Sequence, residues 1–164
     1  MIRTGIGFDA HRFGPGRRLV LGGVEIPGAP GLEGHSDADV LCHAIMDAIL
    51  GAAADGDIGG HFPDTDPAWK GARSVWMLET VVRRAAALGY RVANVDATVI
   101  AETPRLAPHV PAMRAALAAA LGAGAGRVSI KATTVEGMGA LGRGEGMAAL
   151  AVATLDNGPP GESE

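Results

Sequence analysis

Residues 35–47 read HSDADVLCHAIMD, and this stretch decides how the rest of the chain is arranged. Ser36 and Asp39 predict a helix start at which both side chains cap first-turn N–H groups. Apolar residues then recur at helical spacing, so we expect the helix to pack against another element. Asp39, His43 and Asp47 stand one turn apart along one side of the same helix. Such a polar stripe is unusual on a helix that packs in the core. It therefore indicates a metal or phosphate site.

The composition is that of one globular domain with an aliphatic core. The 164 residues can bury a core without disulfides, and 48% are hydrophobic although only 4% are aromatic. A net charge of −4 and the lack of a basic cluster argue against nucleic-acid binding. The chain shows no signal-peptide pattern and no apolar run of membrane-span length, and its single cysteine, Cys42, allows no intrachain disulfide. We therefore expect a cytoplasmic protein that contacts neither nucleic acid nor membrane.

The remaining patterns alternate between strands and helices. Their sum predicts an α/β (α+β) fold: a single domain with a mixed sheet of roughly four strands plus a small hairpin, and about three helices on one face. We expect the domain to span residues 1–156 and residues 157–164 to form a disordered tail. The predicted elements beyond the central helix are a strand at 2–8, a hairpin at 19–26 turning at Gly22-Gly23, helices at 72–88 and 112–121, and strands at 90–101, 128–135 and 147–155.

Three side chains form a candidate zinc site. Asp9 and His11 project from the same face of the first strand, a pair that alone is typical of an ordinary strand end. Combined with His43 they form an Asp/His/His set that leaves the fourth tetrahedral position open, as in catalytic zinc sites. Asp39 or Asp47 would then orient the ring nitrogen of His43 that does not bind metal.

Further carboxylates lie in two glycine-rich loops. Residues 55–67, DGDIGGHFPDTDP, hold four aspartates, which are most often turn and capping residues and become functional only if a cation or a sugar approaches them. Glu136 precedes the loop 137–146 and suits magnesium held together with substrate phosphates. No Ser-His-Asp signature is present, and Cys42 lies among apolar neighbours. The sequence therefore predicts a protein that binds phosphate groups and supplies no nucleophile of its own.

The chain closely resembles the 2-C-methyl-D-erythritol 2,4-cyclodiphosphate synthase family of the non-mevalonate isoprenoid pathway. The resemblance runs in register from about residue 2 to residue 155, and the combination of motifs is specific where each alone is not. The motifs are GFDAHRF at 7–13, HSDADVLCHAIMDAILGAAADGDIG at 35–59, HFPDTDP at 61–67, NVDATVIAETPRLAPHVPAMR at 94–114, IKATTVE at 130–136 and GRGEG at 142–146.

The resemblance implies a homotrimer whose three active sites are shared between neighbouring subunits. It implies zinc on Asp9, His11 and His43, magnesium or manganese on Glu136 together with substrate phosphates, and catalytic roles around the phosphates for His35 and Thr134. The positions that match substrate-binding residues are Asp9, His11, His35, Ser36, Asp57, Ile58, Gly59, Phe62, Pro63, Asp64, Thr65, Asp66, Ala101, Glu102, Thr103, Pro104, Arg105, Leu106, Ala107, Thr133, Thr134, Val135, Glu136 and Arg143.

The implied reaction is intramolecular: the 2-phosphate of 4-diphosphocytidyl-2-C-methyl-D-erythritol 2-phosphate attacks the β-phosphorus and CMP leaves. Ala140 stands where family members often carry an aromatic residue near a channel on the trimer axis, and Phe8, Arg143 and Glu145 match other positions around it. Two alternatives remain open on the residues alone, a zinc-dependent phosphohydrolase and a non-catalytic trimer that binds metal or nucleotide.

Overall fold

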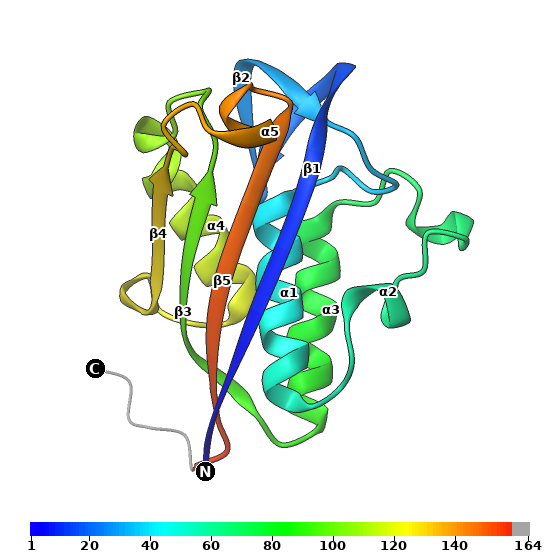
Figure 1. Cartoon of the computed structure of the whole chain (residues 1–164). Helices are drawn as coiled ribbons and strands as arrows, with labels where there is room; N and C mark the ends of the chain where they lie inside the picture. The colour runs from blue at the N-terminus through cyan, green and yellow to red at the C-terminus, as the bar shows by residue number, and fades with distance from the viewer. Residues whose placement is uncertain (159–164) are drawn as a thin grey trace.

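A five-stranded mixed sheet forms one layer of the molecule, and the long helices lie against one of its faces (Figure 1). The computed structural model describes residues 1–158, so most of the predicted tail, 159–164, lies outside the described residues. The sheet has the order β2-β1-β5-β3-β4, in which only β3 and β4 are parallel. The strands are β1 (Ile2–Leu21), β2 (Val24–Leu32), β3 (Arg91–Ile100), β4 (Val128–Thr133) and β5 (Gly146–Asp156).

Three long helices match the three that the sequence predicts, and the mixed α/β class is confirmed. Within the described residues, no helix is long and apolar enough to cross a membrane. Two one-turn helices, α2 and α5, lie in the glycine-rich stretches predicted as loops. The helices are α1 (Val40–Ala53), α2 (Ile58–His61), α3 (Ser74–Ala87), α4 (Val110–Leu121) and α5 (Gly139–Gly142), with single 3₁₀ turns at Pro67–Trp69, Ala107–His109 and Ala125–Arg127.

Helix α1 begins later than the sequence suggests, with Asp39 as its N-cap. The Asp39 carboxylate accepts the N–H of Cys42 at 3.0 Å, whereas the Ser36 hydroxyl accepts that of Ala38 at 3.1 Å and so caps the turn before the helix. The Asp39 carboxylate also accepts the N–H groups of Gly22 and Gly23, at 2.9 and 2.7 Å. This aspartate therefore ties the start of α1 to the hairpin between β1 and β2.

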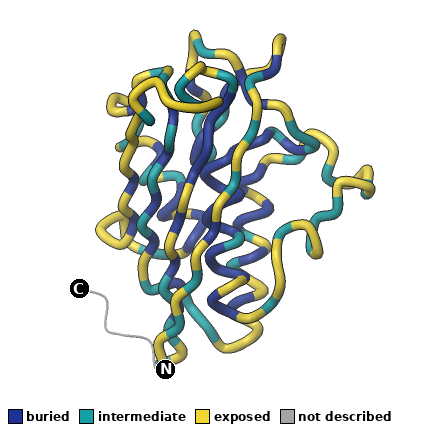
Figure 2. Tube along the Cα trace, viewed as in Figure 1, coloured by how far each residue is buried: buried dark blue, intermediate teal, exposed yellow. Residues whose placement is uncertain are grey.

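Helix α1 lies directly on the backbone of β1 because two glycines leave no side chain between them. A Cβ at Gly5 would come within 2.0 Å of the carbonyl oxygen of Ala48, and one at Gly7 within 2.0 Å of that of Ala44. The dark layer between sheet and helices in Figure 2 is the aliphatic core that this contact builds. The same contact brings α1 against the part of β1 that carries the predicted metal ligands.

The opposite face of the sheet exposes large apolar side chains. Ile6 and Phe8 of β1 are 68% and 59% exposed, and their cross-strand partners Val152 and Leu150 of β5 are 36% and 38% exposed. These four residues form a contiguous apolar strip, hereafter the open sheet face, which is typical of a surface that contacts another protein.

Candidate metal centre

Three predicted ligands, from two elements, converge on one point. Asp9 Oδ2 lies 2.8 Å from His11 Nε2 and 2.8 Å from His43 Nδ1, and the two ring nitrogens are 3.2 Å apart. Ligands held about 2.0–2.1 Å from a tetrahedral zinc lie roughly 3.3 Å from one another, so the observed spacing fits such an ion after a small outward shift. A three-residue set of this kind leaves the fourth position to water or substrate.

The charges at this point favour a cation. Burial would raise the pKa of the Asp9 carboxyl, but hydrogen bonds from His11 and His43 and the charges of those rings hold it far below its usual range. Burial would likewise lower the pKa of His11, but its hydrogen bond to Asp9 and the Asp9 charge raise it. Asp9 is thus a carboxylate at neutral pH, and the two imidazole rings around it are the other candidate metal ligands.

The remaining nitrogen of each imidazole has a hydrogen-bond partner of its own. His11 Nδ1 lies 2.6 Å from the backbone oxygen of Glu33, which can only accept, so Nδ1 carries a hydrogen and Nε2 is the atom that a metal would bind in place of the hydrogen bond to Asp9. His43 Nε2 lies 3.0 Å from Ser74 Oγ and 3.2 Å from Ser36 Oγ. Ser74, at the start of α3, could not be predicted from the sequence, because no motif links it to a residue 31 positions away.

The predicted role of Asp39 or Asp47 in orienting His43 is wrong. Asp39 points toward the hairpin, as described above, and Asp47 accepts the backbone N–H of Ile58 at 2.8 Å. Residues one turn apart lie on the same side of the helix, but each of these carboxylates turns toward the backbone N–H groups nearest to it. Asp47 instead ties α1 to the first residue of α2 and so fixes the wall beside the metal centre.

A cavity of about 500 Å³ opens above the three ligands. His35 reaches it from the turn before α1, with its Nε2 3.2 Å from the backbone oxygen of Asp66. Trp69 and Met77 were not predicted to lie here; Trp69 meets Phe62 edge-on, with ring centroids 4.9 Å apart. The residues that line the cavity are Asp9, His11, Gly34, His35, Ser36, His43, Ile58, Gly59, Phe62, Pro63, Asp64, Trp69 and Met77.

Three aspartates of the loop 55–67 act structurally in this chain. Asp57 caps α2 by accepting the N–H of Gly60 at 2.9 Å, and Asp66 caps the next turn through Ala68 at 2.9 Å. Asp55 pairs with Arg84 of α3. Neither Asp57, Thr65 nor Asp66 lines the cavity, whereas Asp64 does.

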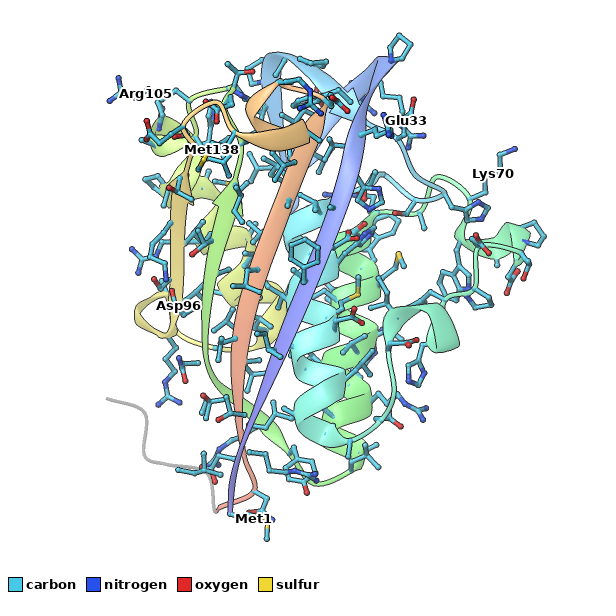
Figure 3. All side chains as sticks on the ribbon, viewed as in Figure 1. Met1, Glu33, Lys70, Asp96, Arg105 and Met138 are labelled. Carbon is cyan, nitrogen blue, oxygen red and sulfur yellow. The ribbon has the colours of Figure 1, made fainter. Side chains whose placement is uncertain are left out.

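The other predicted site residues lie away from this cavity, where β3 and β4 end. There Glu102 Oε1 accepts the N–H groups of Val135 and Gly137 at 3.0 and 3.2 Å, and the Thr134 hydroxyl donates to Glu136 at 3.1 Å. In Figure 3, Arg105 and Met138 mark this side of the molecule, and Lys70 and Glu33 mark the side of the cavity. Residues 101–107 and 133–136 therefore form a second group, separate from the metal centre.

Arg143 belongs to neither group in this chain. It follows α5, and its guanidinium donates to Glu145 at 2.8 Å. Ala140 and Glu145 line a smaller hollow of about 170 Å³ beside β1 and β5.

Comparison with known proteins decides the family. The model of the YgbB family matches residues 2–156. The chain belongs to the YgbB family. A relative, the 2-C-methyl-D-erythritol 2,4-cyclodiphosphate synthase of Symbiobacterium thermophilum, is 62% identical over 151 residues, which cover 92% of this chain and 96% of the relative. The resemblance inferred from the six motifs is therefore confirmed.

Solved structures agree with this assignment to the YgbB family. The bifunctional IspDF of Campylobacter jejuni superposes with a TM-score of 0.91 and 44% identity, over 94% of this chain and 42% of that longer chain. A structure of 2C-methyl-D-erythritol-2,4-cyclodiphosphate synthase in a CDP-bound form gives a TM-score of 0.86 and 37% identity, over 94% of this chain and all of that one (100%).

Proposed function

We propose that this chain is a 2-C-methyl-D-erythritol 2,4-cyclodiphosphate synthase. It converts 4-diphosphocytidyl-2-C-methyl-D-erythritol 2-phosphate into the cyclic diphosphate and CMP, a step of isoprenoid precursor biosynthesis. The observation that carries the proposal is the convergence of Asp9, His11 and His43 beneath an open cavity. The relative that is 62% identical carries the same activity in its name.

Two metals fit the donors of the chain. The Asp/His/His set suits zinc, and the exposed carboxylate of Glu136 suits magnesium or manganese held together with substrate phosphates. Such ions, when bound, polarise phosphate oxygens and neutralise the charge that develops at phosphorus. Asp9, His11 and His43 hold the first ion, and Glu136 contacts the second.

The substrate supplies its own nucleophile. An oxygen of the 2-phosphate forms a bond to the β-phosphorus, and the bond from that phosphorus to the CMP oxygen breaks, so no water is consumed. Cys42 is no competing nucleophile, because burial raises the pKa of its thiol well above the usual value. The task of the chain is to hold the reacting oxygens in line, and such orientation can remove about 7–11 kcal/mol from a barrier.

The cavity residues and the second group each bind a different part of the substrate. His35, Ser36 and Thr134 steady the phosphates, and Asp57 to Gly59 hold the ribose. Phe62 to Asp66 cover the methylerythritol portion, and backbone groups of residues 101–107 read the cytosine. A synthase structure bound to CDP supports a nucleotide diphosphate as the ligand class.

From the resemblance to the synthase family we infer a homotrimer in which each site combines the cavity of one subunit with residues 101–107 and 133–136 of its neighbour. The separation of the two groups within one chain supports this proposal. The open sheet face supplies an apolar surface for that contact. The reaction then takes place in the cytoplasm, a setting compatible with the buried free thiol of Cys42.

Phosphorus NMR of the products tests the activity. Purified protein loaded with zinc and magnesium receives the cytidine substrate, and the proposal predicts CMP and the cyclic diphosphate. Linear phosphate products would favour the zinc-dependent phosphohydrolase, and unchanged substrate would favour a non-catalytic trimer that binds metal or nucleotide. The hydrolase needs a base near the metal, but Asp39 points toward the turn between β1 and β2 and Asp57 does not line the cavity.

A further inference from the structure

We propose that Ser74 and Asp37 are positioning residues that fix which nitrogen of His43 faces the metal. The inference rests on the metal centre proposed above. Ser74 is the first residue of α3 and is fully buried, with 0% of its surface exposed. Its hydroxyl lies 3.0 Å from His43 Nε2 and donates to Asp37 Oδ1. The three side chains thus form a continuous line from a carboxylate to a metal ligand.

The direction of the hydrogen bonds along this line follows from the chemistry of its members. An ionised carboxylate can only accept, so the single hydrogen of the Ser74 hydroxyl goes to Asp37. The Ser74 oxygen then has only lone pairs to offer, and His43 Nε2 must be the donor. When a metal ion occupies Nδ1, the hydrogen of neutral His43 therefore sits on Nε2. The Nδ1 atom, which lies 2.8 Å from Asp9 Oδ2, then gives its lone pair to the metal in place of a hydrogen bond to Asp9.

Asp37 is held in place by backbone contacts, so it cannot easily turn away. The same Oδ1 accepts the backbone N–H of Ser74 at 3.1 Å, and the Asp37 N–H donates to the carbonyl of Ala72 at 3.0 Å. Arg73, the N-cap residue of α3, makes no side-chain cap, so Asp37 caps this helix from another segment. The orientation of His43 is thereby coupled to the start of α3.

Ser36 provides a weaker second acceptor. Its oxygen lies 3.2 Å from His43 Nε2, but that oxygen already accepts the N–H of Ala38 at 3.1 Å. Its hydrogen can point to Ser74 Oγ, 3.3 Å away, which agrees with Ser74 acting as an acceptor. Loss of the Ser74 hydroxyl should therefore weaken the metal site without abolishing it.

Asp37→Asn tests the direction of the line. The oxygen of an asparagine can still accept the Ser74 N–H and O–H, but as a neutral group it holds the Ser74 hydrogen less strongly than a carboxylate does. The Ser74 oxygen is then a poorer acceptor for the hydrogen on His43 Nε2, and Nδ1 becomes a weaker metal ligand. We expect Asp37→Asn and Ser74→Ala each to raise the Kd for zinc by about 10–100-fold, as outer partners of metal-bound histidines commonly do. Thr80→Ala, which removes an exposed hydroxyl from the same helix, should leave zinc binding unchanged.

The test joins zinc titration against a competing chelator with nitrogen NMR of the zinc-loaded protein, in which the His43 signals are assigned by their absence in His43→Ala. The proposal predicts zinc on Nδ1 and a slowly exchanging hydrogen on Nε2 in the native chain, and faster exchange of that hydrogen in Ser74→Ala and Asp37→Asn, a signature that a purely structural role would not produce. Zinc on Nε2 with hydrogen on Nδ1 in the native chain, or native zinc affinity in both variants, would overturn it. If Ser74→Ala does not fold, the zinc-loaded native chain and Asp37→Asn still decide.

Failure of this inference is distinguishable from failure of the metal centre itself. A native chain that binds no zinc would remove the metal centre and leave Ser74 and Asp37 with no metal ligand to position. A native chain that binds zinc through Nε2 of His43, or with equal affinity in both variants, would retain the centre and exclude the proposed line.

Discussion

Asp9 lies between two imidazole rings, and this arrangement could be predicted because its members come in recognisable spacings. Asp9 and His11 are two apart on a strand, and His43 lies on a helix whose polar stripe stands out. The sequence could not supply the partners of those ligands. Ser74 and Trp69 belong to no motif near the ligands and reach the site only through the folding of the segment from α2 to α3.

His43→Ala tests the ligand set at the residue scale. Because two protein ligands hold zinc far less tightly than three, we expect the purified variant to lose its bound zinc after dialysis, as measured by elemental analysis. His61→Ala is the matched control, since His61 contacts Asp55 instead of the three ligands and zinc should be retained. Zinc at full stoichiometry in His43→Ala would exclude His43 as a ligand.

At the scale of elements, helices were predicted better than the strand that carries the ligands. The predicted strand at 2–8 and the first strand of the predicted hairpin are joined in the structure into one strand, β1, that pairs first with β5 and then with β2. The link, residues 13–18, reads FGPGRR and shows no alternation of apolar and polar residues. In the structure the register of the pairing between β1 and β2 shifts within this link. Tertiary pairing, rather than local pattern, keeps this segment extended.

Gly7→Ala tests the contact between β1 and α1. The new Cβ would fall 2.0 Å from the oxygen of Ala44 and 2.7 Å from the nitrogen of Ala48, both backbone atoms that cannot turn aside. We expect a loss of about 1–3 kcal/mol or more in the free energy of unfolding, together with weaker zinc binding, because the shift separates the ligands on the two elements. Urea unfolding and zinc titration measure these effects.

Gly126→Ala is the control for this substitution, because a Cβ at Gly126 meets nothing within 4 Å. It should leave both the free energy of unfolding and the zinc affinity near those of the native chain. Equal behaviour of Gly7→Ala and Gly126→Ala would contradict the close approach of α1 to β1.

The ion pair between Asp55 and Arg84 predicts a pH-dependent contribution to stability. The hydrogen bond from Arg84 lowers the pKa of the Asp55 carboxyl below its value in the unfolded chain. The contribution is therefore fully present above the unfolded pKa of about 3.9 and is lost as the pH falls through the lower folded pKa. Since the pair lies near the surface and is screened by solvent, this contribution is small.

Urea unfolding of the metal-free native chain and Asp55→Asn measures this contribution. At pH 7 the native chain should have a larger free energy of unfolding than Asp55→Asn. This difference should shrink when the pH is below the pKa of the Asp55 carboxyl in the unfolded chain. Arg84→Gln, which removes the other partner, should show the same trend. A difference that grows as the pH falls would contradict the assigned sign.

At the scale of the whole molecule, one chain holds two groups of predicted site residues that it does not bring together. The three predicted metal ligands lie on β1 and α1, whereas residues 101–107 and 133–136 lie at the ends of β3 and β4. Composition and periodicity carry no information on this separation. The resemblance alone predicted a site shared between subunits, and the open sheet face of Ile6, Phe8, Leu150 and Val152 is the surface that such an assembly would bury.

Mixing two inactive variants tests the shared site. His43→Ala removes the metal centre and Glu136→Ala removes the second group, so each variant alone should be inactive. After both are unfolded and refolded together, some sites combine the intact half of each subunit. Random assembly should restore about a quarter of native activity. No recovery, despite trimers by light scattering, would place each whole site within one subunit.

The most direct test of the account is the source of the oxygen atoms in the products. The chain is given its cytidine substrate in water enriched with oxygen-18, and CMP and the cyclic product are analysed by mass spectrometry. Because the 2-phosphate is the nucleophile and no water enters, both products should carry no oxygen-18. One oxygen-18 atom incorporated per turnover would contradict intramolecular attack and identify the enzyme as a phosphohydrolase.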